Sequence, residues 1–186
     1  HEPENDTTSI TQAALAADFA VLQQQWADAH TETAGAKITT ASVLMSYTYR
    51  DVSGRPWATW QAATEPCQVQ GIDYYAYQTN PTANRLLVSA PLTDVLTRTD
   101  TRPLAFAELG QTRSIDTTIG PGAWNQAMAD FYDLAAADDR IVASCYFDSG
   151  YNSVEPWPLT TAERTYYNAT LRTRAYSVTA ADVLGG

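Results

Sequence analysis

Lysine is almost absent from this sequence. Arginines make up 10 of its 11 basic residues, Lys37 is the only lysine, and 21 acidic residues bring the formal net charge to −10. Nucleic acids and anionic membrane surfaces are bound through a basic footprint, which releases counterions or meets phosphates. The composition therefore argues against nucleic acid and membrane as partners, and it suits a neutral polymer better.

Cysteine is also scarce, and Cys67 and Cys145 lie far apart without metal-type spacing. They indicate neither a disulfide framework nor a zinc site, and we expect two free thiols. No apolar run is long enough to span a bilayer, and the opening HEPENDTT is too polar for a signal peptide. Since the sequence lacks an initiator Met, we expect a cleavage product, an expressed part or a piece of something longer.

What the chain does contain is a repeated apolar pattern, within 186 residues that are 45% apolar and 17% charged. Four short runs, rich in β-branched and aromatic residues, recur about 33–38 residues apart, which is the spacing of successive βα units. Their near-continuous hydrophobicity predicts strands buried on both faces, as in a parallel sheet. The runs are Ala36–Met45, Val69–Tyr77, Leu104–Leu109 and Ile141–Phe147.

Helices are predicted between the runs. One spans about 10–29 and another about 123–137, and Thr160-Thr161-Ala162-Glu163 is a capping box that starts a third. We expect the apolar stripe of the first helix to face inward; it consists of Leu15, Phe19, Leu22 and Trp26.

The segment 52–66, rich in Ser, Gly, Pro and Trp, is predicted to be a long loop that carries Trp57 and Trp60. Loops with exposed aromatics after a barrel strand commonly contact substrate, so Trp57 is a candidate substrate-binding residue. A packed lid is the alternative. The pattern does not decide between them.

Repeated βα units fit either an open doubly wound sheet or a barrel. The glycine-rich dinucleotide fingerprint and the P-loop are both absent, which removes the main functional support for the open sheet. The pattern of apolar runs leaves the choice open.

Two acidic segments are candidates for chemistry. Glu108, in TRPLAFAELGQ, ends an apolar run, and in a barrel strands deliver their last side chains to the catalytic rim. The opening HEPEND offers several acids before the first helix, and by themselves these acids favour a cluster stabilised by the helix dipole over a catalytic role. A structural salt bridge is the alternative for Glu108.

Together, HEPEND and RPLAFAELG resemble the catalytic signature of clan A glycoside hydrolases, most closely family 26 and its relatives in actinobacteria and their phages. The resemblance implies that Glu2, after His1, is the acid/base at the end of strand four and that Glu108 is the nucleophile on strand seven. It also implies that Tyr75, in GIDYYAY, hydrogen-bonds the nucleophile and that Tyr146, in RIVASCYFDS, floors a sugar subsite.

The fold that this resemblance implies is α/β: residues 1–186 are the C-terminal part, from the end of strand four to strand eight, of one (β/α)8 TIM-barrel domain. The implied activity is retaining hydrolysis of a β-linked polysaccharide, such as a mannan or a cell-wall glycan, with no cofactor and no metal. Two carboxyls about 5–5.5 Å apart perform that reaction.

A half barrel exposes strand edges, so we expect the N-terminal half of the barrel to come from the same or another chain. The expected location is extracellular or virion-associated, as in a phage tail. Two other functions remain open: a glycan-binding barrel with little or no turnover, and a domain that only fills an assembly.

Overall fold

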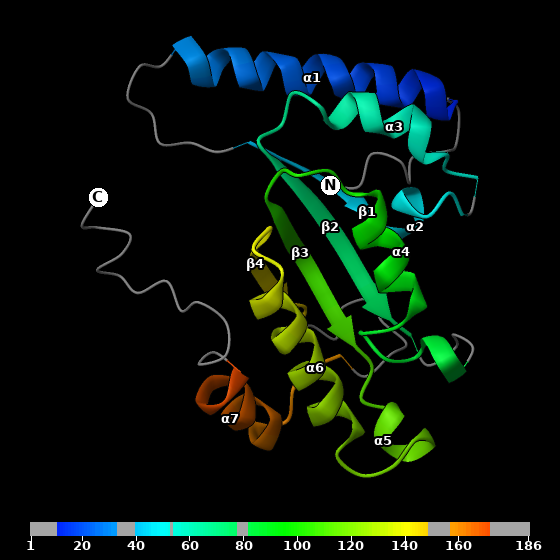
Figure 1. The fold of residues 1–186 in the computed structure, drawn as a ribbon, viewed down its shortest axis with the longest axis vertical. Helices are drawn as coiled ribbons and strands as arrows, with labels where there is room; N and C mark the ends of the chain where they lie inside the picture. Colours follow the sequence, from blue (N-terminus) through cyan, green and yellow to red (C-terminus); the bar gives the residue numbers. More distant parts are fainter. Residues whose placement is uncertain (1–10, 33–39, 53, 78–81, 149–156, 172–186) are drawn as a thin grey trace. The chain divides into compact units, whose positions relative to one another are not determined.

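The computed structural model describes residues 11–32, 40–52, 54–77, 82–148 and 157–171, and it has an α/β fold (Figure 1). Strands alternate with helices along the chain, as the spacing of the apolar runs predicts. The elements are α1 Gln12–Glu32, β1 Ala41–Met45, α2 Ser46–Tyr49, α3 Trp57–Thr64, β2 Val69–Ala76, η2 Thr82–Asn84, α4 Ala90–Arg98, β3 Leu104–Gln111, α5 Ile115–Thr118, α6 Ala123–Ala137, β4 Ile141–Tyr146 and α7 Thr161–Ala169.

The four predicted strands form one sheet in the order β1-β2-β3-β4. The pairs β1–β2 and β3–β4 are parallel, and the arrows of β2 and β3 run the same way in Figure 1. The predicted parallel sheet is thus confirmed, with β3 extending two residues beyond the expected Leu109.

The two faces of the sheet differ in burial. Successive strand residues point to opposite faces, and paired residues of neighbouring strands point to the same face. We call one side the covered face, because five of its side chains on β1, β2 and β3 are at most 2% exposed: Leu44, Ile72, Tyr74, Phe106 and Leu109. We call the other side the open face; Val43, Tyr75, Ala105 and Glu108 on it are only half-buried.

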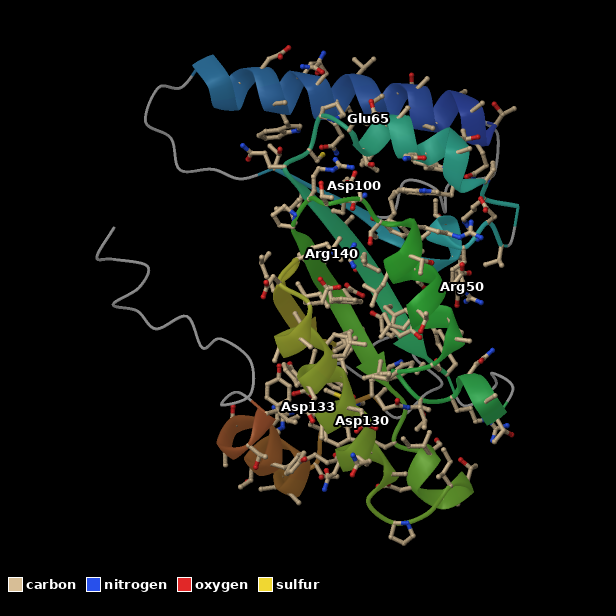
Figure 2. The ribbon with its side chains drawn as sticks, viewed as in Figure 1. Arg50, Glu65, Asp100, Asp130, Asp133 and Arg140 are labelled. Carbon is tan, nitrogen blue, oxygen red and sulfur yellow. The ribbon has the colours of Figure 1, made fainter. Side chains whose placement is uncertain are left out.

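At the end of the sheet where the strands begin, arginines bind backbone carbonyls. Arg140 Nη1 donates to the Asp100 carbonyl (3.1 Å) and to Thr99 Oγ1 (3.2 Å), and Figure 2 labels Asp100 and Arg140 there. Arg102 donates to the Cys67 carbonyl (2.9 Å) and to the Asp100 carboxylate, and the Arg102 hydrogen bond lowers the pKa of Asp100. These hydrogen bonds therefore stabilise the end of the sheet where the strands begin.

The segment 52–66 is not a long loop, and this prediction was wrong. Residues Trp57–Thr64 form α3, whose first N–H donates to Asp51 Oδ1. Trp57 and Trp60 are 7% and 0% exposed, spaced to share one helix face. The spacing of Trp57, Trp60 and Ala63, with further alanines between them, was the helix signal that the flanking Gly and Pro obscured.

Helix α1 is where it was expected, but its buried stripe is different. It packs on α3 through Phe19, whose ring centroid lies 5.9 Å from that of Trp60, and through Gln12, which accepts from Trp60 Nε1 at 2.9 Å. Leu22 and Trp26, expected to face inward, are 53% and 63% exposed. Phe19 lies three residues before Leu22, and Gln12 lies three residues before Leu15. Since each residue turns the helix by about 100°, this shift rotates the contacting stripe by about 60° around the helix axis.

By their contacts, the residues divide into two compact units. The first contains His1–Tyr75, Ala90–Leu109 and Arg140–Tyr146, and the second contains Ala76–Ser89, Gly110–Asp139 and Phe147–Gly186. The first unit therefore holds most of the sheet together with α1 to α4.

The second unit is built around α6, whose predicted bounds are confirmed. Trp124, Met128 and Phe131 are buried, and Trp124 Nε1 donates to the Gln111 carbonyl at 3.1 Å. The hydroxyls of Tyr132 and Tyr167 lie 2.6 Å apart, joining α6 to α7. The predicted capping box at the start of α7 is also present.

Candidate active site

Glu108 lies in the C-terminal half of β3 and is half-buried. The sequence predicted that Glu108 ends its strand. Because β3 runs on to Gln111, Glu108 lies inside the strand instead. A carboxylate within a strand of a parallel sheet is unusual, since charged groups are seldom buried without a partner.

The partner of Glu108 is Tyr75 on β2. The Tyr75 hydroxyl donates a hydrogen bond to Glu108 Oε2, so the structure brings together two of the residues that the sequence singled out. A donor on one carboxylate oxygen fixes the orientation of the group. A carboxylate that is fixed and still partly open has the form that nucleophilic attack requires.

In its pairing with β4, strand β3 has a β-bulge that includes Glu108. Phe106 pairs with Ser144 and Leu109 pairs with Tyr146, so β3 advances three residues where β4 advances two. The extra residue of β3 falls at Ala107–Glu108. Bulges re-aim side chains and are frequent beside active sites.

The hydrogen bonds to β2 also leave one extra residue in β3. Gln70 N donates to the Pro103 carbonyl (2.9 Å), which pairs 70 with 104 in a parallel ladder. Thr112 N donates to the Ala76 carbonyl (3.2 Å), which pairs 76 with 111. Between these points β3 has one residue more than β2, so both neighbouring strands register the bulge.

Ring contacts show what the bulge does. Tyr74 and Tyr75 are adjacent on β2 and so point to opposite faces. Tyr74 meets Phe106, with ring centroids 6.4 Å apart, while Tyr75 meets Glu108. In a regular strand Phe106 and Glu108 would share a face. The bulge instead keeps Phe106 on the covered face and turns Glu108 to the open face.

The other predicted substrate contacts lie elsewhere. Trp57 is buried and its ring stacks on Tyr49, with centroids 4.5 Å apart, which fits the packed alternative rather than an exposed loop aromatic. Tyr146 ends β4, half-buried, paired with Leu109. Paired residues share a face, so the register puts Tyr146 on the side of Leu109, and its role beside a sugar stays a prediction.

His1 and Glu2 lie outside the described residues, so the expected acid/base and its neighbour are not placed. In the part of the chain that the structure describes, no three His, Cys, Asp or Glu side chains gather closely enough to hold a metal ion. None of the helices there combines the length and apolar character that crossing a bilayer requires.

Sequence reasoning did not single out Asp73, a buried acid on β2. It precedes Tyr75 by two on β2, pairs with Met45 of β1, and is 4% exposed. The available signal was an acid in the middle of the apolar run VQGIDYYA, where a charge is costly.

Comparison with known proteins assigns no family. No protein-family model matches the chain, and no curated protein matches it either.

Proposed function

We propose that this protein is a retaining glycoside hydrolase that cleaves a β-linked polysaccharide, with Glu108 as the nucleophile. The observation that carries the proposal is the hydrogen bond from Tyr75 to Glu108, on the half-open face of a parallel sheet. Double displacement needs an ionised carboxylate held still against the anomeric carbon. The bulge at Ala107–Glu108 supports the proposal, because it turns that carboxylate away from the covered core.

In the proposed mechanism, Glu108 attacks the anomeric carbon and forms a covalent glycosyl-enzyme intermediate, which water then hydrolyses. The resemblance to family 26 makes Glu2 the acid that protonates the leaving oxygen and later the base that activates water, with His1 beside it. Glu2 and Glu108 would then lie about 5–5.5 Å apart. The substrate class is neutral glycan, mannan-like or from a cell wall, which the net charge of −10 suits.

The finer fold in this proposal is a (β/α)8 barrel of which residues 1–186 supply the last strands. Two exposed apolar regions support further barrel elements from the same or another chain. Leu22 and Trp26 face away from α3 on α1, and Val142, on the outer strand β4, is 56% exposed. An extracellular or virion-associated location would put such an enzyme in contact with its polymer.

The test is turnover of β-linked glycans and activated aryl β-glycosides by the intact natural protein. Glu108→Ala should abolish release of reducing ends, and azide should restore reaction on the aryl glycosides with inverted anomeric configuration. Glu65→Ala, which removes an exposed acid elsewhere on the first unit, is the control and should keep wild-type rates. Near-wild-type turnover by Glu108→Ala would refute the assignment, and glycan binding without any turnover would favour the binding-module alternative.

Glu2 is tested by leaving-group dependence. Glu2→Ala should be slow on glycans with poor leaving groups and relatively spared on activated aryl glycosides, which need little protonation. Equal losses on both classes of substrate would remove Glu2 from the acid/base role.

A further inference from the structure

Helix α1 is much longer than the helix that packs on it. At a rise of about 1.5 Å per residue, the 21 residues of α1 extend about 31 Å, whereas the 8 residues of α3 extend about 12 Å. α1 meets α3 and the segment after it through Gln12, Phe19 and Gln23. Figure 1 shows α1 running on past α3 toward its C-terminal end. That end of α1 therefore has room for a second helix.

This part of α1 carries an apolar stripe, which we call the outer stripe: Leu22, Trp26 and Ala29. Leu22 and Trp26 are 53% and 63% exposed, and Ala29 is exposed as well. The three residues are four and then three positions apart, which is the spacing of a seam between two helices. Single exposed apolar residues are ordinary on a protein surface, whereas neighbouring ones at helical spacing indicate an interaction surface.

The charges around the outer stripe are all negative. Residues 11–29 and 57–65 contain no Lys or Arg, and their charged side chains, Asp18, Asp28 and Glu65, are exposed; Figure 2 labels Glu65. Asp18 lies one turn before Leu22 and therefore beside the outer stripe. Asp28 lies about 120° from Leu22 around the axis and accepts a hydrogen bond from Gln24 Nε2 at 2.8 Å. A basic side chain of a partner would thus meet Asp18.

A helix with basic flanks fits this surface better than other partners. The backbone of a helix is hydrogen-bonded within itself, so a strand cannot be added to α1, whereas the outer stripe has the spacing that a second helix matches. A second copy of α1 would bring Asp18 and Asp28 again, with no Lys or Arg in residues 11–29, and like charges across an interface are unfavourable. Nucleic acid and anionic membranes are disfavoured for the same reason.

We propose that the outer stripe of α1 docks an amphipathic helix of a partner protein, whose apolar side is flanked by Lys or Arg. The apolar side covers Leu22 and Trp26, and a basic residue lies against Asp18. Anchors at positions i, i+4 and i+7 are typical of helix recognition. The surface belongs to the first unit, and the proposal does not rest on the proposed glycosidase activity.

Trp26 is a natural reporter for the first experiment. The other four tryptophans of the sequence, which are Trp57, Trp60, Trp124 and Trp157, are at most 7% exposed. In the intact natural protein, acrylamide should quench a water-exposed emission that is missing from Trp26→Phe. If Trp26 is shielded in that protein without any partner, the outer stripe is already covered by its own chain or by a second copy, and the proposal is overturned.

The second experiment titrates the intact natural protein with a labelled synthetic helix that has Leu on one stripe, Lys elsewhere and no Trp. Binding should raise the anisotropy of the label and shift Trp26 emission to the blue. The same peptide with Glu in place of Lys should bind at least about tenfold more weakly. Leu22→Gln and Trp26→Gln should each weaken binding about tenfold.

The matched control is Val21→Gln. Val21 is as exposed as Leu22, at 57%, but lies about 100° away around the axis, so binding should change by less than about twofold. Equal binding of the Lys peptide to wild type, Leu22→Gln and Trp26→Gln would mean that it follows the net charge alone, and it would overturn the proposal. Binding of the Glu peptide as tightly as the Lys peptide would overturn the basic flank.

The charge contact is tested separately. Asp18→Asn should weaken binding of the Lys peptide about two- to fivefold at low salt, and the difference should shrink as salt is added. The control is Asp28→Asn, on the other side of the helix, which should behave as wild type. Equal effects of the two substitutions would contradict the placement of the basic residue. Since no readout uses turnover, failure here leaves the proposed function standing, and inactivity toward glycans leaves the docking surface standing.

Discussion

The covered and open faces of the same sheet are built on different principles. Leu44, Ile72 and Phe106 on the covered face are large, apolar and inaccessible to water. The open face has small residues such as Gly71 and Ala105, with Tyr75 and Glu108 between them. Large apolar side chains stabilise a fold through the area they bury, whereas a site needs space and polar groups. The comparison assigns stability to the covered face, and the proposed chemistry belongs to the open face.

The largest loss of stability is expected from a substitution on the covered face. Phe106→Ala should lower the free energy of unfolding by about 3–5 kcal/mol, because it removes a fully buried ring that meets Tyr74. A smaller truncation on the half-buried open face, Val43→Ala, should cost about 1 kcal/mol. Urea denaturation measures both. Similar losses would show that the two faces contribute equally and would end the comparison.

The second effect tests why the open face is lined with small residues. A Cβ on Gly71 would lie 2.5 Å from the Ser42 carbonyl oxygen and 2.7 Å from Val43 Cγ2. Gly71→Ala should therefore cost about 1–3 kcal/mol, since β1 must move away from β2. Thermal melts measure the loss.

The control for Gly71 is Gly54→Ala. Gly54 has no neighbour within 4 Å of an added Cβ, but its φ of +72° strains any other residue by about 1 kcal/mol. A larger loss at Gly54 than at Gly71 would show that conformational strain, rather than the close approach of β1, decides the cost.

The sequence predicted the elements better than it predicted their faces. The apolar runs located all four strands, and the stripe through Trp124 and Phe131 located α6 with its observed bounds. The same reasoning was only partly right for α1, where Phe19 packs on Trp60 as expected but Leu22 and Trp26 are exposed. A helix with apolar residues on two adjacent stripes can bury either, and the partner, here Trp60, makes the choice.

The candidate site was predictable in part. The contact between Tyr75 and Glu108 was expected from the resemblance of their segments to strands six and seven of a known family, and the hydrogen bond is present. The bulge at Glu108 was not expected, and neither was Asp73. A bulge exists only in the pairing of one strand with its neighbours, so the residues 104–111 by themselves carry too little information to reveal it.

A third, smaller effect concerns a buried hydrogen bond to the backbone of β2. Tyr49 is fully buried, and its hydroxyl donates to the Gly71 carbonyl at 3.1 Å. Tyr49→Phe keeps the ring that stacks on Trp57 but removes this hydrogen bond, so it should cost about 1 kcal/mol. Tyr47→Phe, which removes the hydroxyl of a half-buried tyrosine on the same helix, should stay within about 0.5 kcal/mol of wild type. Equal losses, measured by urea denaturation, would mean that the Gly71 carbonyl is satisfied in another way.

The smallest effect is a difference in chemical reactivity between the two thiols, one exposed and one buried. Cys145, on the outer strand β4, is exposed, while Cys67 is 2% exposed and its thiol lies 2.7 Å from Gln23 Oε1, to which it donates. Burial raises the pKa of the Cys67 thiol and outweighs the opposite effects of Ser42 and Arg102. Iodoacetamide should therefore modify Cys145 in the native protein and Cys67 only after unfolding, as mass spectrometry of the labelled peptides would show.

The raised pKa of Cys67 also sets the direction of a pH effect. Above the ordinary thiol pKa of about 8.5, the unfolded chain loses this proton while the folded chain keeps it. The unfolded state then binds fewer protons, so the Cys67 contribution to stability is present below that pH and declines as pH rises through it. Cys67→Ala should remove this part of the alkaline decline in urea midpoints between about pH 8 and 10, and Cys145→Ala should leave it. If Cys67 reacts as fast as Cys145 in the folded protein, the packing of α1 against the segment before β2 is looser than its hydrogen bonds indicate.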